Sequence, residues 1–196
     1  MTKMTDAVLD QLFRTARSHN AWRPEPVNPS DLEALYDLMK MGPTSANCSP
    51  ARLVFVTSPE GKARLIPHML ESNRVKTETA PVTVILAYDT QFYDRIPELF
   101  PHMPSARDWF AHDAQVARDT ALRNGSLQGG YLMLAARALG LDVGPMSGFD
   151  AEGVNAAFFP DGRFAVNFIC NLGYGDPAGL FERSPRLSFA DACQLV

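Results

Sequence analysis

The feature that most constrains the fold is one long helical pattern, which covers residues 114–139. At ~1.5 Å per residue such a helix is roughly 39 Å long, enough to cross a small domain. Its apolar stripe, at the spacing of one helical face, consists of Leu127, Tyr131, Leu134 and Ala138. Gly140 follows directly as a suitable C-terminal cap. We therefore expect a central helix.

Glycines interrupt this helical pattern at Gly125, Gly129 and Gly130. Each costs about 1 kcal/mol relative to alanine inside a helix, because glycine loses more backbone freedom on folding. A close approach of another backbone would offset that cost. We expect the glycines to face a second copy of the helix in a dimer.

Three segments have the composition of β-strands, at residues 52–57, 82–88 and 164–172. The second is an almost unbroken apolar run, which is typical of a strand buried on both faces. Helical patterns separate and follow the strands, and Ser58, Asp150 and Ser188 are their expected N-caps. With 46% hydrophobic residues, residues 1–196 are expected to form one domain of interleaved helices and strands.

Charge and cysteine content argue against several classes of function. A net charge of −4 provides no basic field for nucleic acid or for an anionic membrane, and no apolar run approaches the roughly 18 residues of a membrane span. Cys48, Cys170 and Cys193 are widely spaced, so neither a disulfide framework nor a metal site is expected. These features favour a cytoplasmic protein with reduced thiols.

Residues 89–113 break the alternation of helices and strands. Prolines punctuate this segment, and its aromatic residues are Phe92, Tyr93, Phe100, Trp109 and Phe110. Such an excursion is more typical of a functional loop than of a core element. We predict that it forms a lid.

The familiar signatures of protein-based catalysis are missing from the sequence. It has no nucleophile elbow, zinc-protease helix, Walker loop or dinucleotide-binding glycine motif after a strand, and its four histidines are scattered. If the protein is an enzyme, a bound cofactor is therefore expected to carry the reaction.

Two segments early in the chain offer polar groups to such a cofactor. Arg17 and Ser18 lie near the end of the first helical pattern, where cations and a hydroxyl suit a phosphate; cations there also simply complement a helix dipole. A polar turn then follows Gly42, and its main-chain and side-chain amide groups suit contact with a planar heterocycle. Its residues are Pro43, Thr44, Ser45 and Asn47. An ordinary capped linker explains this turn equally well.

Two later segments complete the set. Asn73 and Lys76 share one helical face, although such a pair is usually a solvated surface. A glycine-rich turn precedes the helix capped by Asp150. One interpretation is that it lets a backbone donor approach a ligand closely, and the other is that it simply connects two helices. Its residues are Pro145, Met146, Ser147 and Gly148.

The four segments, in this order, resemble the nitroreductase family of FMN-dependent oxidoreductases, and the resemblance runs over nearly the whole chain. It implies that Arg17, Ser18 and a late arginine, Arg183, hold the FMN phosphate. The other contacts that the resemblance implies are residues 43–47 beside the flavin ring, Asn73 and Lys76 at the ring and ribityl chain, and residues 145–148 beside flavin N5.

The same resemblance implies an architecture and a mechanism. The fold is expected to be an α+β layered sandwich with a mixed central sheet, in an entwined homodimer with two FMN sites built from both chains. NADH or NADPH reduces FMN, leaves, and the substrate then takes the hydride in the same space. Lys76 is expected to stabilise negative charge on the reduced ring.

Residues 41–52 and 144–150 are most similar to the malonic semialdehyde reductases of pyrimidine degradation within that family. Ser49 and Ala51 replace the glutamine and tryptophan of the broader family pattern. A small anionic aldehyde is the expected substrate, bound by Arg107, or less favourably Arg52 or Arg123, beneath Trp109 and Phe110. The alternatives are a broad-specificity nitro or quinone reductase and a non-catalytic flavin-binding dimer.

Overall fold

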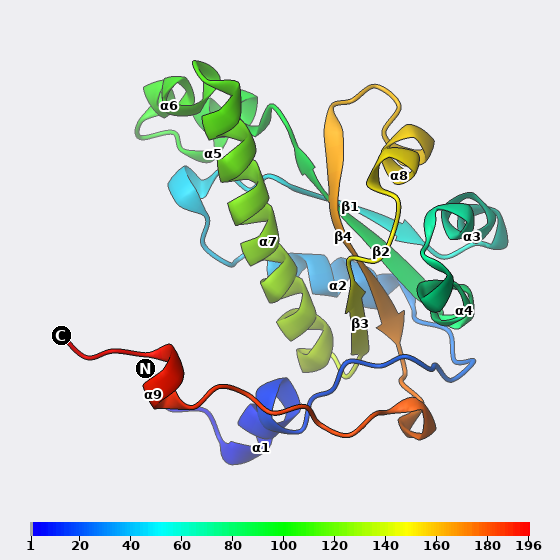
Figure 1. Ribbon diagram of the computed structural model, residues 1–196. Coiled ribbons are helices and arrows are strands. Elements are labelled where there is room, and N and C mark those ends of the chain that lie inside the picture. The colour runs from blue at the N-terminus through cyan, green and yellow to red at the C-terminus, as the bar shows by residue number, and fades with distance from the viewer. Residues whose placement is uncertain (1) are drawn as a thin grey trace.

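The computed structural model describes residues 2–196 and confirms the α+β class (Figure 1). In this part of the chain four strands form one sheet, in the order β1-β2-β4-β3. Their bounds are β1 Ala51–Val56, β2 Val82–Asp89, β3 Asp142–Met146 and β4 Phe164–Gly173. Each neighbouring pair of these strands is antiparallel, so the sheet is antiparallel and not mixed. A parallel contact exists as an isolated bridge between Ser18 and Val143, because β3 is an edge strand with free backbone groups.

The helices surround this sheet. Their bounds are α1 Asp6–Leu9, α2 Pro29–Met39, α3 Pro59–Leu65, α4 Glu71–Thr79, α5 Ile96–Leu99, α6 Asp108–Ala111, α7 Ala114–Ala138, α8 Ala151–Phe158 and α9 Phe189–Ala192. Ser58, Asp150 and Ser188 accept bonds from the first-turn amides of α3, α8 and α9, as predicted. A π-helical turn, Asp10–Arg14, extends α1.

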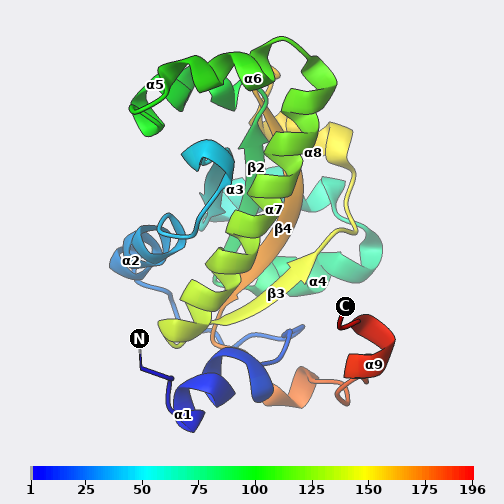
Figure 2. The same cartoon turned by 90° about the vertical axis from the view of Figure 1, so that its left-hand side faces the viewer.

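Alternating side chains of β2 divide the core into two layers. Val84 and Leu86 pack with α2 and α7 on one face, whereas Ile85 and Ala87 pack with α3 and α8 on the other. Figure 2, turned so that α7 lies in front of the sheet, shows α2 beside it. Both faces of β2 are therefore covered, as its apolar run predicts.

Strand β3 is absent from the sequence-based expectation, which treated its residues as a turn between helices. Gly144 and Pro145 lie within it, and both residue types are unfavourable in a central strand. Here β3 is an edge strand, so Pro145 needs no ladder partner on its outer side. At Gly144 a Cβ would lie 2.5 Å from the carbonyl oxygen of His19, so glycine lets the segment after α1 pack against the strand.

The prediction that Gly129 contacts a partner helix is wrong. A Cβ at this position would lie 2.4 Å from Cζ of Phe168 and 3.2 Å from Cδ1 of Leu86, so Gly129 faces the sheet of its own chain. At neighbouring Gly130, by contrast, no described atom lies within 4 Å of the corresponding position. The close approach that offsets the helix-breaking glycine is therefore between α7 and β4.

Residues 89–113 fold as short helical turns at one end of α7. Phe92, Ile96 and Phe110 are buried there with Cys48 and the first turns of α7, so the segment has a core of its own. Figure 2 shows α5 and α6 above the sheet at the end of the molecule opposite α1. Among residues 2–196, no helix is long and apolar enough to cross a membrane.

Candidate functional site

Three of the four predicted cofactor-binding segments meet along the edge strand β3. The segment after α1 lies on the strand, where the amide of His19 donates to the carbonyl of Val143 at 2.9 Å. Helix α4 contacts the same segment, where Nζ of Lys76 donates to Oδ1 of Asn20 at 3.1 Å. Residues 17–20, 73–76 and 145–148 therefore lie together beside β3 and form one polar surface.

Asn73 and Gly148 are held together at the far end of this surface. The buried Asn73 side chain donates from Nδ2 to the carbonyl of Gly148 at 2.8 Å, and the amide of Leu70 donates to the same oxygen at 3.1 Å. A Cβ on residue 148 would lie 2.5 Å from Nδ2 of Asn73, so the bare glycine backbone permits this contact. The sequence predicts that this backbone approaches a ligand; here it approaches the side chain of Asn73, and the contact with a ligand stays a prediction.

The neighbouring predicted residues have distinct environments. Lys76 is partly buried, and that burial lowers its pKa. Thr77, one residue further along α4, contacts the sulfur of Met146 at 3.6 Å. Pro145 and Ser147 are exposed on either side of Met146. Pro145 and Ser147 therefore face outward at the end of β3, while Met146 packs against the hydrophobic layer.

Arg17 and Arg183 lie together at the opposite end of the surface. Nη2 of Arg183 donates to the carbonyl of Ala16 at 2.8 Å, and Arg17 donates to the carbonyl of Phe181. The structure therefore brings the C-terminal arm to the end of the first helix, as the predicted pairing of these arginines requires. Ser18 is exposed beside them.

A cavity of about 320 Å³ opens next to Arg17 and is also lined by His19 and Arg137. Nε2 of His19 lies 3.3 Å from Oδ1 of Asp142. In the described chain, Nδ1 of His19 and Nε of Arg137 are buried without hydrogen-bond partners. Burial also lowers the pKa of Arg137. Asp142 also lines this cavity, but the two guanidiniums, of Arg17 and Arg137, outnumber it, and a guanidinium with an unused donor fits an anion such as a phosphate.

Residues 43–47 lie apart from the other three segments, beside α7 and the 89–113 segment (Figure 1). The amide of Ser45 donates to Oδ1 of Asn124 at 2.9 Å, and Nδ2 of Asn47 donates to the carbonyl of Leu99 at 2.8 Å. Ala46 and Asn47 have φ angles of 49° and 50°, a left-handed conformation that is unfavourable for non-glycine residues. Such strain concentrates at functional sites.

The predicted substrate-binding residues divide among different environments. Phe110 is buried in the core of the 89–113 segment, whereas Trp109 is 50% exposed. Nη2 of Arg107 lies 3.2 Å from Oδ1 of Asp94, and its guanidinium stacks over Tyr93. Arg107 is therefore already neutralised.

The two other candidate arginines also differ. Arg52 pairs with the buried Asp89 at 2.9 Å. Arg123 is exposed on α7 and has no carboxylate within 4.0 Å among residues 2–196. Of the three cations that the sequence proposes for a substrate carboxylate, Arg123 is the one without a competing acid.

Sequence reasoning assigned no role of their own to three residues that line this surface, His19, Asn20 and Arg137, although His19 ends the segment that it proposed for a phosphate. The first two directly follow Arg17 and Ser18, so their position in the chain was a usable signal. Arg137 lies at the end of α7, and its proximity to Arg17 depends on how α7 packs against the turn after α1, where Nη1 donates to the carbonyl of Leu12 at 2.9 Å. No local pattern indicates that contact.

The residues present fit FMN. The cavity lined by Arg17 and Arg137 lies at one end of the polar surface, and the contact between α4 and Gly148 lies at the other. Between them, the segment of residues 17–20 lies beside β3 and spans up to roughly 10 Å, since extended chain rises about 3.3 Å per residue. A phosphate and a flat polar ring need donors separated in this way. Among residues 2–196 no cluster of three metal-ligating side chains occurs.

Comparison with known proteins gives a consistent assignment. The family model described as "Nitroreductase family" matches residues 13–174. A protein of Ralstonia nicotianae, provisionally named as an NADH dehydrogenase/NAD(P)H nitroreductase, is 57% identical over 196 residues, which cover 100% of both chains. A provisionally named nitroreductase of Bacillus subtilis superposes with a TM-score of 0.89 at 23% identity, over 98% of this chain and 100% of that chain.

A second solved structure includes a ligand in its description. It is a provisionally named nitroreductase of Exiguobacterium sibiricum in complex with FMN, with a TM-score of 0.88, 21% identity and 100% coverage of both chains. At this level of identity the likeness to both solved structures establishes the shared fold.

Proposed function

Because this chain belongs to the nitroreductase family, we propose that it is an FMN-dependent oxidoreductase that uses NAD(P)H to reduce a small anionic aldehyde, malonic semialdehyde, to 3-hydroxypropionate. The observation that carries the cofactor assignment is the convergence on β3 of three segments that are distant in sequence, residues 17–20, 73–76 and 145–148. Each supplies the donors that a phosphorylated flavin needs.

The chain's own residues bind and orient the cofactor in this proposal. Arg17 and Arg183 hold the phosphate at the arm, while Asn73 and Lys76 contact the ring from α4. FMN, when bound, supplies hydride transfer between the nicotinamide and the substrate. Lys76, whose only side-chain bond within the described chain is to Asn20, is positioned to stabilise negative charge on the ring.

We propose that two copies of the chain build each site, because residues 43–47 lie apart from the other three segments, against Asn124 and Leu99 (Figure 1). Their loop is exposed, so it is free to face the partner's β3 surface. Helix α7 exposes Leu122 and Leu127, and its outer face lines a hollow of about 600 Å³. An exposed apolar helix face of this kind is typical of a dimer interface.

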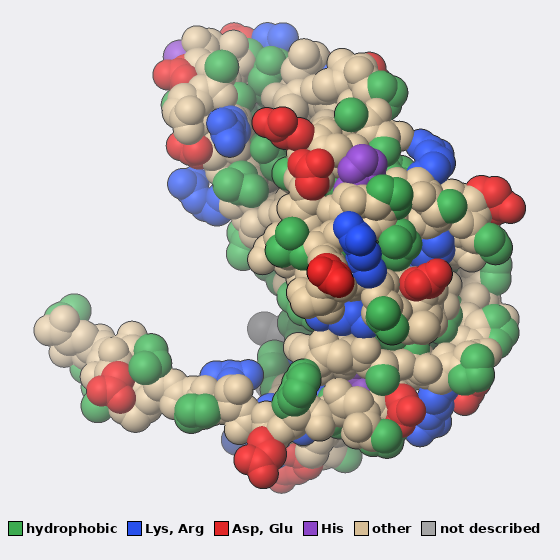
Figure 3. Space-filling view, turned by 45° about the vertical axis from the view of Figure 1, so that its right-hand side comes forward, with side chains coloured by type: hydrophobic (Ala, Val, Ile, Leu, Met, Phe, Trp, Pro, Cys, Tyr) green, Lys and Arg blue, Asp and Glu red, His purple; other side chains and the backbone are tan. Residues whose placement is uncertain are grey.

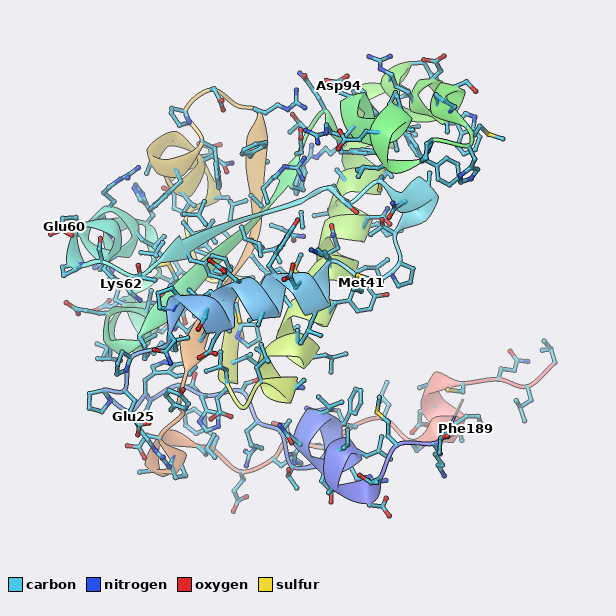
Figure 4. All side chains as sticks on the ribbon, turned by 180° about the vertical axis from the view of Figure 1, so that it is seen from behind. Glu25, Met41, Glu60, Lys62, Asp94 and Phe189 are labelled. Atoms are coloured by element: carbon cyan, nitrogen blue, oxygen red, sulfur yellow. The ribbon has the colours of Figure 1, made fainter. Side chains whose placement is uncertain are left out.

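The C-terminal arm supports the same dimer. Every residue from 181 to 196 is exposed, and Figure 3 shows the arm extending away from the body of the molecule. Its apolar side chains include Leu187 and Phe189, which are 76% and 66% exposed; Figure 4 labels Phe189 on α9. An arm with exposed apolar residues gains stability by packing on a second copy.

The aldehyde assignment depends on the cations near the proposed interface. A short substrate with a carboxylate needs one guanidinium in addition to the hydride-transfer site. Arg123 on α7 meets this requirement better than Arg107, which is engaged by Asp94. Trp109, which is 50% exposed on α6, is available to exclude water from the partner's site.

A broad-specificity nitroreductase is the second candidate, favoured by the names of the relatives. The test compares kcat/KM for malonic semialdehyde, propanal and a nitrofuran with one reductant. We expect the semialdehyde to exceed propanal at least tenfold, since a hydrogen bond to a charged group is worth about 1.5–3 kcal/mol. Equal values for semialdehyde and propanal would exclude a carboxylate-binding cation, and a higher value for the nitrofuran would favour the second candidate.

Removing either proposed phosphate ligand is expected to weaken FMN binding. Arg17→Ala and Arg183→Ala should each raise the FMN dissociation constant roughly 10- to 150-fold, which corresponds to the loss of about 1.5–3 kcal/mol for a charged hydrogen bond. Quenching of FMN fluorescence during titration measures this change. Arg14→Ala is the matched control, because Arg14 lies three residues before Arg17, at the end of the helical turn, but pairs with Asp6 and Asp10. Wild-type affinity in both variants would mean that these arginines only attach the arm.

A further inference from the structure

A buried polar cluster lies behind the cofactor surface, in a layer that is otherwise apolar. It consists of Lys62 on α3, Thr83 on β2 and Asn171 on β4, which are 9%, 0% and 0% exposed. The surrounding side chains of this layer include Val56, Leu65, Ile85 and Ile169. Polar groups in such surroundings reduce stability unless each one is hydrogen-bonded.

The cluster is fully connected and ends on helix α4. Nζ of Lys62 donates to Oγ1 of Thr83 at 2.6 Å, and the Thr83 hydroxyl donates to Oδ1 of Asn171 at 2.7 Å. Thr83 and Asn171 are direct cross-strand partners, so the sheet register fixes this pair. Lys62 projects from α3 toward α4 (Figure 4).

Two carbonyls in the last turn of α4 accept bonds from this cluster. Nζ of Lys62 donates to the carbonyl of Thr77 at 2.6 Å, and Nδ2 of Asn171 donates to the carbonyl of Lys76 at 3.0 Å. The last carbonyls of a helix have no partner within the helix, so these bonds satisfy them. The N-terminus of α4, at Leu70, has no side-chain cap. The cluster is therefore the polar anchor of α4 on the sheet.

A lysine is an unusual choice for this position. Among residues 2–196 no carboxylate lies within 4.0 Å of Nζ of Lys62. Lys62 and Glu78 on α4 line the same surface cavity of about 470 Å³. The charged neighbours on α3 itself are Glu60 and Arg64. Burial lowers the pKa of Lys62 to about 8. A buried cation without an ion-pair partner contributes little to stability. Its hydrogen bond to α4 instead fixes the position of that helix.

That geometry determines where the cofactor-facing side chains project. Asn73 and Lys76 lie three residues apart on α4 and reach Gly148 and Asn20, respectively. The carbonyl bound by Asn171 belongs to Lys76 itself. Asn73 lies in the first turn of α4 and Lys76 near its end, so a shift or rotation of the whole short helix, which its anchored last turn prevents, would move both side chains relative to β3.

We propose that Lys62 is a positioning residue for the cofactor site, which acts with Thr83 and Asn171 to fix the last turn of α4 and so to place Asn73 and Lys76. This inference rests on the proposed function, since it takes FMN as the group that these side chains contact. Lys62 itself does not touch the cofactor in this arrangement; it acts through α4.

The experiment measures the FMN dissociation constant, the midpoint potential of bound FMN and the melting temperature in the intact protein. Lys62→Met removes the donors, and Thr83→Val removes the hydroxyl at nearly constant volume. We expect both variants to raise the FMN dissociation constant roughly tenfold and to shift the midpoint potential, because the contacts from α4 become misplaced. Thr83→Ser, which keeps the hydroxyl, is expected to retain wild-type values.

Lys40→Met is the matched lysine control, since Lys40 is exposed and pairs with Asp37 on α2. If Lys62→Met does not fold, Thr83→Val decides the outcome. Variants that melt at lower temperature but keep the wild-type FMN affinity and midpoint potential would overturn the positioning role and leave only a structural one. A wild-type protein that binds no FMN would instead overturn the proposed function, and this inference with it.

Discussion

Replacing Gly129 by leucine is expected to destabilise the folded chain by about 3 kcal/mol or more, because the new side chain enters a filled space. Already at Cβ it would lie 2.4 Å from Cζ of Phe168 and 2.5 Å from Cε1 of the same ring. The gain in helix propensity, up to about 1 kcal/mol, is too small to compensate. Urea unfolding followed by circular dichroism measures the change, and we expect a large loss of folded protein at 37 °C.

Gly130→Leu is the matched control, because it makes the same chemical change one residue further along the same helix. No described atom lies within 4 Å of a Cβ at Gly130, which lines the hollow on the outer face of α7. This variant should therefore keep the fold, and light scattering should reveal a weakened dimer if α7 forms the interface. Equal stability of Gly129→Leu and the wild type would show that Phe168 and Leu86 move aside at little cost.

This pair of glycines illustrates what sequence can predict about α7. The length and ends of the helix follow from its periodicity and from Gly140, and the structure confirms them to within one residue at the C-terminus. The face on which each glycine lies is also fixed by the period. What covers that face depends on the ring of Phe168, which comes from a strand almost 40 residues away in the chain.

Strand β3 shows the opposite difficulty. Its residues include glycine and proline, which predict a turn by local propensity. Pairing with β4 overrides that propensity, with Val143 opposite Leu172 and Pro145 opposite Cys170. The preference of this segment for a strand therefore comes from its neighbour in the sheet, and the sequence around Gly144 does not contain it.

The candidate site was predictable as a set of residue types but not as an arrangement. Arg17, Asn73 and Gly148 were selected from local chemistry and resemblance, and the structure places their segments along β3. The separation of residues 43–47 from that surface depends on α7, which holds Asn124 near its middle and Arg137 at its C-terminal end. Distances along a helix between packed segments are tertiary information.

Replacing Asp89 by alanine is the second large effect that we expect, a loss of about 3 kcal/mol of stability. The Asp89 side chain is 3% exposed and accepts from Nε of Arg163 at 2.6 Å and from Nη2 of Arg52 at 2.9 Å. The hydrogen bond to Asp89 raises the pKa of Arg163. Removal of the carboxylate leaves two guanidiniums without their shared partner. Both are about one-third exposed, so water limits the cost to the lower end of the range for buried pairs.

Asp89 also connects the sheet to the 89–113 segment, so the loss should not be uniform. It ends β2, its Oδ1 accepts from the amide of Gln91 at 2.9 Å, and Arg163 also contacts Asp94 within that segment. Hydrogen exchange in Asp89→Ala should therefore increase first in residues 92–111, before the amides of β2 and β4 lose protection. Asp94→Ala is the matched control, because Asp94 is 40% exposed and its bonds to Arg107 and Arg163 are 3.2 and 3.4 Å long. An exposed pair contributes about 1 kcal/mol or less. Similar losses for the two variants, or a uniform rise in exchange, would show that the buried carboxylate does not anchor this segment.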